Sequence, residues 1–287
     1  MSAAGRALVV RAVSGPVLVQ DAGRPGHAAI GVGASGAADR ASYALGNRLV
    51  GNEAGAACLE IVLGGLEVEA TATTWVCVTG APAPLLLDGR AEPSGAVLAL
   101  RPGARLRLDV PASGLRSYLA VRGGLDVPMV LGSRSRDTLA GLGPAPLAPG
   151  DVLAVGDRAA ASPLVDAVPA TSYDDTPVLR VVPGPRADRV ADLARLVAEC
   201  WRVGAASDRV GLRLEGRGLE LVPDRGELPS EGALRGAIQV PPDGGPVVFG
   251  PDHPVTGGYP VAAVVLDADT DRLAQLRPGT DLRFRWA

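Results

Sequence analysis

The sequence predicts a mainly β protein made of two barrel-like units with a few short helices. Only two Phe, three Trp and four Tyr occur in 287 residues, so Val, Leu, Ile and Ala must build most of the core. The 38 glycines and 25 prolines favour many short strands joined by turns. The pattern L-R-P-G-x-x-L-R-apolar occurs at 100–108 and 276–284, near the end of each half. This recurrence favours tandem β units with a ligand cleft between them, and a common turn motif is the alternative.

The strands are predicted from short apolar runs bounded by Gly and Pro. A strand over 6–19 should break at Ser14-Gly15-Pro16, as in a hairpin. Alternation along the strand that follows Ala57 would point the carboxylate of Glu60 to solvent. The arginine-rich segment 132–138 is expected to be a solvated surface loop. The further predicted strands are 58–63, 66–70, 74–79, 85–87, 96–100, 105–110, 117–121, 151–155, 178–182 and 280–286.

Three helices are predicted from apolar residues at helical spacing. The first covers 38–50, with Ser35 as its cap and Asp39 near the positive end of its dipole. The second covers 187–201 and carries an apolar stripe, and the third is a short helix over 270–276. The helices are thus few and short, as expected for a mainly β chain.

The chain is predicted to divide in linear order. An N-terminal β domain covers 1–112, and a connecting β segment with a linker covers 113–176. The C-terminal β-barrel domain then covers 177–287. The linker is placed at 156–177, which is rich in Ala, Pro, Ser and Asp and lacks a periodic apolar pattern.

Charge and composition limit the partners and the chemistry. The net charge is −3 and the arginines are scattered, so we expect no nucleic-acid partner. The chain contains no lysine, which excludes a phosphate-binding Walker lysine, a Schiff-base lysine and a lysine that carries biotin. If ATP or biotin takes part in the reaction, a partner chain must supply the lysine.

The cysteines and the N-terminus predict a soluble cytoplasmic protein. Cys58, Cys77 and Cys200 lie in apolar neighbourhoods, as expected for buried thiols in a reducing compartment. Residues 1–11 lack the pattern of a signal peptide, and no apolar stretch approaches the length of a membrane span. We therefore expect no membrane contact, and we predict no metal site.

The stretch 230–260 contains the residues best suited to chemistry. Apolar runs at 237–240 and 246–249 flank a Pro-Pro-Asp-Gly-Gly turn and predict a hairpin. The following loop, 250–260, combines an acid, an imidazole, a hydroxyl, paired glycines and an aromatic ring. Glycine N–H groups can bind an anion, and a carboxyl or imidazole group can act as acid or base. The loop can therefore bind and polarise a small carbonyl compound, although its residues also suit a tight structural connection. These residues are Asp252, His253, Thr256, Gly257, Gly258 and Tyr259.

The motifs SEG, GAIQVPPDG and DHPVTGGYP, at 230–232, 236–244 and 252–260, resemble the C-terminal half of a known family. This is the allophanate hydrolase subunit 2 family, also called the 5-oxoprolinase C-subunit family or the biotin-dependent carboxyltransferase family. It includes a KipA-like antagonist of a sporulation kinase inhibitor. The resemblance covers nearly the whole chain and implies a cyclophilin-like β-barrel for at least the C-terminal half. Further similar blocks occur in the family's order at 20–26, 35–40, 59–65, 118–124, 131–135 and 207–213.

The resemblance also implies a set of site residues. Asp252 or His253 would serve as the catalytic acid or base. Arg24 or Arg209, together with the backbone of Thr256-Gly257-Gly258, would hold a carboxylate or phosphoryl oxygen. The other candidate substrate-binding residues are Ser35, Asp39, Glu231, Gln239 and Tyr259, with Glu231 and Gln239 as orienting groups.

In function, the resemblance implies a component of an ATP-dependent 5-oxoprolinase that opens the pyroglutamate ring to give glutamate. The expected partners are a subunit-1-like protein, which is the KipI-like B subunit of 5-oxoprolinase, and a LamB/YcsF-like protein, which is its A subunit. The chain itself would bind no cofactor, and ATP with Mg would enter through the partner complex. Two alternatives stay open: carboxyl transfer between biotin and urea or a similar amide, and a regulatory module that binds a kinase inhibitor.

Overall fold

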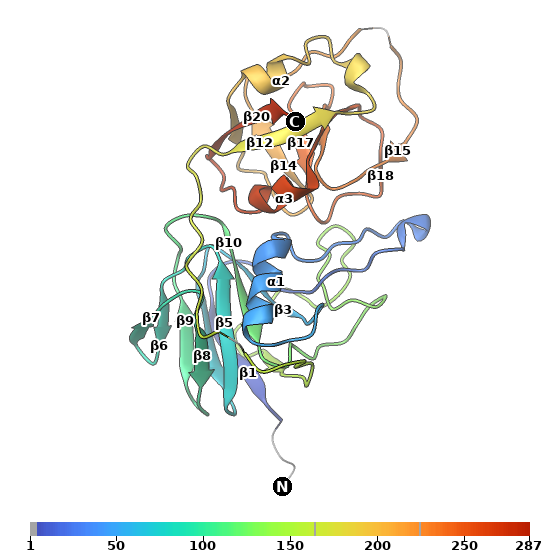
Figure 1. Cartoon of the computed structure of the whole chain (residues 1–287). Helices are drawn as coiled ribbons and strands as arrows, with labels where there is room; N and C mark the ends of the chain where they lie inside the picture. Colours follow the sequence, from blue (N-terminus) through green and yellow to red (C-terminus); the bar gives the residue numbers. More distant parts are fainter. Residues whose placement is uncertain (1–4, 164, 224) are drawn as a thin grey trace. The chain divides into compact units, whose positions relative to one another are not determined.

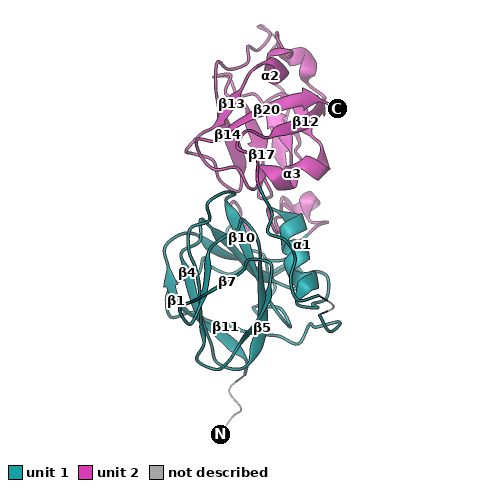
Figure 2. Cartoon of the chain, turned by 60° about the vertical axis from the view of Figure 1, so that its left-hand side comes forward, with its two compact units in different colours: residues 1–24, 39–136, 141–172 teal, residues 25–38, 137–140, 173–287 magenta. Residues whose placement is uncertain are grey.

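The computed structural model describes residues 5–163, 165–223 and 225–287, which form two compact units (Figures 1 and 2). The first unit extends to Arg24 and also contains Asp39–Arg136 and Gly141–Ser172. The second unit contains Pro25–Ala38, Asp137–Ala140 and Tyr173–Ala287. Two short stretches from the first half of the chain therefore belong to the second unit, which is magenta in Figure 2.

The first unit consists of two antiparallel sheets that share one apolar core. The six-stranded sheet has the order β11 (Val152–Ala154), β1 (Ala7–Val13), β4 (Leu66–Ala70), β9 (Arg105–Leu108), β6 (Leu85–Leu87) and β7 (Arg90–Glu92). The five-stranded sheet has the order β2 (Val17–Gln20), β3 (Cys58–Val62), β10 (Arg116–Val121), β5 (Thr74–Gly80) and β8 (Val97–Leu100). Most predicted strands are thus present. The break at Ser14 does not make a hairpin, because Ser14 pairs with Gly65 and β1 and β2 enter different sheets.

The helix α1 (Arg40–Leu49) packs on β5 and β10 of the five-stranded sheet (Figure 1). A Cβ at Gly46 would lie 2.9 Å from Thr79 Oγ1, so glycine permits this close approach. The helix cap is Asp39, whose carboxylate accepts a hydrogen bond from the Ser42 N–H. The prediction that Ser35 caps the helix is wrong, because the chain enters the helix four residues later.

Glu60 is buried, and the expectation that it points to solvent is wrong. Alternation does turn its side chain away from the apolar core, but the α1 side of the sheet is covered. The Tyr118 hydroxyl donates to Glu60 Oε2 at 2.8 Å and accepts from the Asp39 N–H at 2.7 Å. Burial, and next the charge of Glu60, raise the pKa of Tyr118 well above its ordinary value. Tyr118 therefore keeps its proton and links β3 to the start of α1.

The second unit is built around a closed seven-stranded barrel. Its order is β12 (Val178–Pro183), β19 (Val261–Val265), β16 (Ala237–Gln239), β17 (Val247–Phe249), β14 (Gly211–Glu215), β13 (Trp201–Val203) and β20 (Asp281–Trp286). The parallel pairing of β12 with β20 closes the barrel around a core that includes Trp201 and Phe284. The predicted fold class is confirmed: the protein is mainly β, with a closed barrel in its C-terminal half and open sheets elsewhere.

The second unit also contains two short helices and a two-stranded sheet. The helices are α2 (Arg195–Ala198) and α3 (Asp267–Leu273), and β15 (Glu231–Gly232) pairs with β18 (Thr256–Gly257). The predicted short helix near 270–276 is therefore present as α3, which begins slightly earlier.

The predicted long helix over 187–201 is wrong. The chain forms a 3-10 turn at Ala187–Arg189 and then pairs with a neighbouring segment, because Val190 bridges Leu221 and the Ala191 N–H donates to Glu220 O. Only the single turn α2 remains helical. The apolar stripe that suggested a helix still packs inward, with Val190 and Leu196 in the barrel core.

The recurring L-R-P-G pattern marks the same turn in two surroundings. Arg101 O accepts from the Ala104 N–H at 2.9 Å, and Arg277 O accepts from the Thr280 N–H at 3.0 Å. The first turn follows β8, whereas the second follows α3. The two segments therefore share a local turn, and both explanations of the recurrence stay predictions.

Two expectations about exposure are also corrected. Cys200 is exposed, whereas Cys58 and Cys77 are buried as predicted. The arginine-rich segment is not a solvated loop, because Ser133 and Ser135 are fully buried by contacts to a distant aspartate. None of the helices in the described part of the chain combines the length and apolarity needed to cross a membrane.

Candidate functional site

The candidate site lies in the C-terminal unit, beside the predicted hairpin. Ile238 of β16 pairs with Val248 of β17, which confirms the hairpin. The chain leaves β17 at Phe249, forms the loop 250–260 and enters β19. Within this loop, β18 pairs with β15, so the loop is fixed at its centre as well as at its ends.

A buried aspartate fastens this loop to three other segments, and we call this group the Asp252 cluster: Asp252, Arg209, Ser35 and Thr138. Asp252 Oδ1 accepts from Ser35 Oγ at 2.7 Å and from Arg209 Nη2 at 2.9 Å. Asp252 Oδ2 accepts from Arg209 Nε at 2.8 Å, Thr138 N at 2.8 Å and Thr138 Oγ1 at 2.7 Å. Arg209 also donates to Gly36 O at 2.7 Å. Ser35 has a φ of +53°, an unusual conformation that aims its hydroxyl at the cluster.

The Asp252 cluster holds a stable charge pair. Burial would raise the pKa of the Asp252 carboxyl, but the Arg209 charge and the hydrogen bonds from Arg209, Ser35 and Thr138 together hold it below its ordinary value. Asp252 is therefore a carboxylate near neutral pH, with both oxygens already engaged. These contacts suit a residue that positions the loop, and its use as an acid or base stays a prediction.

His253 follows directly and is half-buried. Its ring stacks on Phe249 with 5.8 Å between centroids and 16° between planes. Nδ1 lies 2.7 Å from Pro254 O, and a carbonyl oxygen can only accept, so Nδ1 carries a hydrogen. In the neutral ring, Nε2 then holds the lone pair. With Nδ1 engaged in this way, Nε2 is the ring nitrogen that can accept a proton.

A cleft of about 490 Å³ opens beside this loop. Its apolar wall comes from the barrel strands and two prolines, and its polar groups come from β14, β16 and the loop. Pocket volumes of this size suit small ligands. The lining residues are Asp208, Val210, Gly211, Arg213, Gln239, Pro241, Val247, Phe249, Pro254, Gly257, Gly258 and Tyr259.

Gln239 connects the barrel to the loop at this cleft. Its Nε2 donates to Tyr259 O at 3.1 Å, and only 7% of the residue is exposed. A Cβ at Gly257 would lie 2.4 Å from Gln239 Nε2, so this position requires glycine for the amide to fit. The predicted residues Gln239, Gly257, Gly258 and Tyr259 therefore lie together in the cleft wall.

Glu231 lies on β15, the strand that pairs with β18 of the loop. Arg186 binds its carboxylate through Nε and Nη2, with Nε 2.9 Å from Oε1, and these hydrogen bonds lower the pKa of Glu231. Because Glu231 lies in β15 and pairs with Gly257 of β18, the ion pair positions the glycine backbone. Thr256, on the same strand, is exposed.

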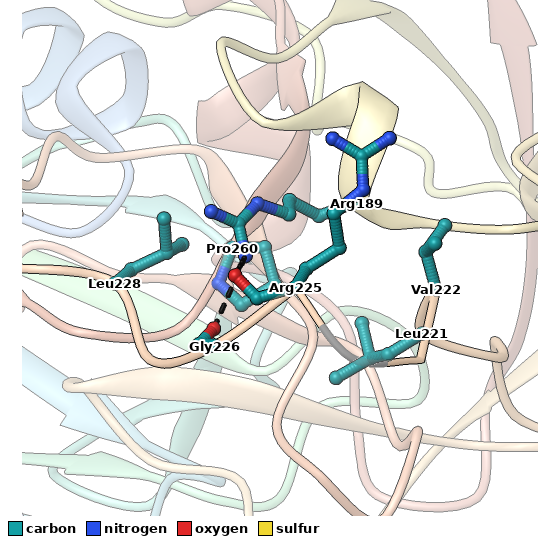
Figure 3. Close-up of a pocket in the computed structure, with 7 residues that line it drawn as sticks. All are labelled: Arg189, Leu221, Val222, Arg225, Gly226, Leu228 and Pro260. Atoms are coloured by element: carbon teal, nitrogen blue, oxygen red, sulfur yellow. Dashed lines mark hydrogen bonds between the residues drawn. The ribbon is translucent and has the colours of Figure 1, made fainter.

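A smaller pocket of about 200 Å³ borders the end of the same loop at Pro260 (Figure 3). Arg189 donates to the carbonyl oxygens of Arg225 at 2.6 Å and Gly226 at 3.1 Å. This arginine therefore holds the neighbouring segment in place. Leu221, Val222 and Leu228 make the rest of the pocket apolar. Its lining includes none of the residues predicted for the site.

Arg24 and Asp39 belong to the first unit, so they are not part of this cleft. Arg24 is 1% exposed and donates to the carbonyl oxygens of Val130 and Ser135. Asp39 caps α1 through hydrogen bonds from Ser42 N and Oγ. Both residues therefore have structural roles, and their contribution to ligand binding stays a prediction.

The cleft residues that were missed from the sequence include Asp208, Arg213 and Phe249. Asp208 Oδ1 accepts from the N–H groups of Val210 and Gly211, at 2.8 and 3.1 Å, and so shapes the entry to β14. Phe249 provides the surface on which His253 stacks. The segment 207–213 already resembled a family block, but only the structure shows that Arg209 is buried ahead of β14 while Arg213 is exposed on that strand.

Comparison with known proteins now identifies the family. The family model for the carboxyltransferase domain, subdomain A and B, matches residues 30–286. The chain belongs to this carboxyltransferase family. It is 40% identical over 272 residues to the C subunit of 5-oxoprolinase from Escherichia coli K12, covering 93% of this chain and 86% of that protein. It is 31% identical over 291 residues to urea amidolyase of Saccharomyces cerevisiae, covering 91% of this chain and 16% of that protein.

Solved structures of the family have the same fold. The crystal structure of the protein TTHA0988 matches with a TM-score of 0.87 and 36% identity over 98% of this chain. This chain spans 56% of the TTHA0988 chain. The Kluyveromyces lactis urea amidolyase structure matches with a TM-score of 0.89 and 29% identity, over 97% of this chain and 18% of that one.

Proposed function

We propose that this chain is the C subunit of an ATP-dependent 5-oxoprolinase that hydrolyses 5-oxoproline to glutamate. The observation that carries the proposal is the 40% identity with the Escherichia coli protein of that name, over most of both chains. The urea amidolyase relatives are similar over a small part of their length, so their names describe much larger proteins.

The loop 250–260, which contains His253, and the cleft beside it supply groups that suit this reaction. Hydrolysis adds water to the lactam carbonyl carbon, the carbon–nitrogen bond breaks, and the ring nitrogen takes up a proton. We assign the proton transfers to His253, because its Nε2 bears the lone pair in the neutral ring. The N–H group of Gly258, which follows β18, is a candidate to stabilise the negative carbonyl oxygen. Asp252 and Arg209 would hold the loop in place.

The partners would supply what this chain lacks. Since the sequence has no lysine, a lysine that binds phosphate must come from another chain. We therefore propose that ATP and Mg are bound by the complex that this chain forms with a subunit-1-like protein and a LamB/YcsF-like protein. We propose that this complex acts in the cytoplasm.

The test is co-expression of the three proteins, followed by measurement of glutamate release from 5-oxoproline with and without ATP. We expect release that needs ATP and every chain. His253→Ala should lower kcat by about 100-fold or more, as for the loss of a general base. His27→Ala is the matched control, because His27 is the other histidine of the chain. A folded complex that releases no glutamate would overturn the proposal.

A second candidate is carboxyl transfer to urea or a similar amide. It is favoured by the family description and by the similarity to urea amidolyase. Biotin would have to be carried by a separate chain, since this one has no lysine. Urea-dependent consumption of bicarbonate, with biotin carboxylase and carrier proteins added, would support this candidate over 5-oxoprolinase.

A further inference from the structure

The cleft contains one cationic side chain among its described lining residues, Arg213. Arg213 lies on β14 and is exposed, two positions from the buried Gly211. Its backbone N–H donates to Ser207 Oγ, but its guanidinium has no hydrogen bond or ion pair with residues 5–163, 165–223 or 225–287. Arg209, by contrast, is committed to Asp252. A guanidinium available at the edge of a cleft suits a carboxylate ligand.

The acidic residue of the same cleft does not neutralise Arg213. Asp208 Oδ1 is bound to the N–H groups of Val210 and Gly211, and it forms no ion pair with Arg213. Asp208 would repel an anion at its own position. A carboxylate ligand is therefore directed to the Arg213 side of the cleft.

Gln239 offers a second kind of recognition. One N–H of its amide is used by Tyr259 O, while Oε1 has no hydrogen bond with any described residue. Because Gln239 is buried, its amide is held in one orientation. A primary amide has a donor and an acceptor side by side, and a small lactam ring forces its own N–H and C=O onto one edge. These two edges can pair through two hydrogen bonds.

We propose that Gln239 and Arg213 together select a cyclic amide that bears a carboxylate. Gln239 binds the cis-amide edge of the ligand, and Arg213 binds its carboxylate. Phe249 and Val247 provide the apolar wall for the ring methylenes. The identity of the ligand, 5-oxoproline, rests on the proposed function. The assignment of the amide edge to Gln239 and of the carboxylate to Arg213 rests on the geometry of the cleft. A neutral amide would keep the contact with Gln239 and lose the contact with Arg213.

The test compares two ligands on the full chain by ligand-observed NMR titration: 5-oxoproline, and 2-pyrrolidinone, which lacks the carboxylate. Arg213→Gln should weaken 5-oxoproline binding by about tenfold or more, as expected for a charged hydrogen-bond pair. The same variant should leave 2-pyrrolidinone binding unchanged. The matched control is Arg283→Gln, because Arg283 is an exposed arginine of β20 outside the cleft. N-methyl-5-oxoproline should bind more weakly than 5-oxoproline to every variant, because it cannot donate to Gln239.

The outcomes separate this inference from the proposed function. If the assembled complex hydrolyses 5-oxoproline and Arg213→Gln leaves its KM unchanged, the inference is overturned while the proposed function stands. If Arg213→Gln weakens both ligands equally, Arg213 acts on the shape of the cleft and the inference is also overturned. If the full chain binds 5-oxoproline through Arg213 but no complex turns it over, the recognition stands and the proposed function fails.

Discussion

Each unit of the protein contains a buried aspartate that gathers loops from distant parts of the chain, but the two aspartates are stabilised differently. Asp252 is bound by the cation Arg209 as well as by Ser35 and Thr138. Asp21, in the first unit, accepts from Ser133 Oγ and Ser135 Oγ, each at 2.6 Å. It also accepts from the N–H groups of Gly23, at 2.8 Å, and Arg134, at 2.6 Å. We call these residues the Asp21 cluster.

The difference shows two ways to bury a carboxylate. The Asp21 cluster uses neutral donors, so the loss of one donor leaves no opposite charge behind. In the Asp252 cluster each charge depends on the other, because Asp252 and Arg209 are both nearly inaccessible to solvent. The cluster that borders the candidate site is therefore the more sensitive to a change of charge.

The largest effect should come from removing the carboxylate charge. Asp252→Asn leaves Arg209 buried without its counter-ion, and should lower the free energy of unfolding by about 3–5 kcal/mol. Asp21→Asn keeps one acceptor oxygen and leaves no buried cation without its counter-ion, so we expect a loss of about 1–3 kcal/mol in the free energy of unfolding. Urea denaturation measures both, with Trp201 fluorescence reporting on the barrel and Trp75 on the first unit. An equal or larger loss for Asp21→Asn would contradict the comparison.

The pH dependence should sharpen the same contrast. The pKa of Asp252 is lowered in the folded protein, so its stabilisation is complete above the unfolded pKa of about 3.9 and is lost as the pH falls through the lower folded value. The difference in unfolding free energy between the native protein and Asp252→Asn should therefore shrink as the pH is lowered from about 6 toward about 3, a range that spans the unfolded pKa. Urea titrations at a series of pH values measure it. If the difference in unfolding free energy between the two proteins stays constant over this range, the charge of Asp252 is not the source of the stabilisation.

An intermediate effect is expected where the loop meets the cleft. Gly257→Ala places a methyl group against Gln239 Nε2, and overpacking of this kind costs about 1–3 kcal/mol. The matched control is Gly232→Ala, because Gly232 lies on the partner strand and a Cβ there would contact nothing within 4 Å. The control should change stability by less than about 0.5 kcal/mol. Thermal unfolding and 5-oxoproline titration of both variants provide the measurement, and equal behaviour would rule out the proposed crowding.

The smallest effects should come from single hydroxyl groups. Ser35→Ala removes one hydrogen bond to Asp252, which keeps its bonds to Arg209 and Thr138, so about 1 kcal/mol is expected. Ser135→Ala removes a donor to Asp21 and also the acceptor of the Asp21 N–H, so the loss should be larger, about 1–3 kcal/mol. Urea denaturation again gives the comparison. A greater loss for Ser35→Ala would mean that the Asp252 cluster depends on its neutral donor more than on its ion pair.

Local patterns in the sequence were enough to predict most of the strands, the hairpin of β16 and β17 and the loop 250–260. Each depends on alternation or turn chemistry within a few residues. The same local patterns failed for Glu60 and for the predicted helix over 187–201. In both, the outcome was decided by a distant segment: α1 covers the face of Glu60, and residues 220–222 pair with the chain near Val190.

The candidate site was predicted only in part for the same reason. The residues of the loop 250–260 were identified because they are adjacent in sequence. Arg213 lies in a segment that had also been noticed, but its position depends on which face of β14 points outward. The partners of Asp252 were quoted separately, and no pattern in the sequence links Thr138 to a carboxylate 114 positions away.

The Asp252 cluster also has a consequence for synthesis of the protein on the ribosome. Ser35 and Asp252 are separated by 217 positions, and Thr138 and Asp252 by 114. At about 5–20 residues per second, Ser35 is made roughly 10–40 s before its acceptor exists. Segments 25–38 and 137–140 therefore cannot form their contacts with Asp252 until the loop 250–260 has been synthesised. A chain that stalls after β11 and before Asp252 would contain every residue of the first unit's sheets and still lack the candidate site, so ligand binding reports that synthesis has passed the loop 250–260.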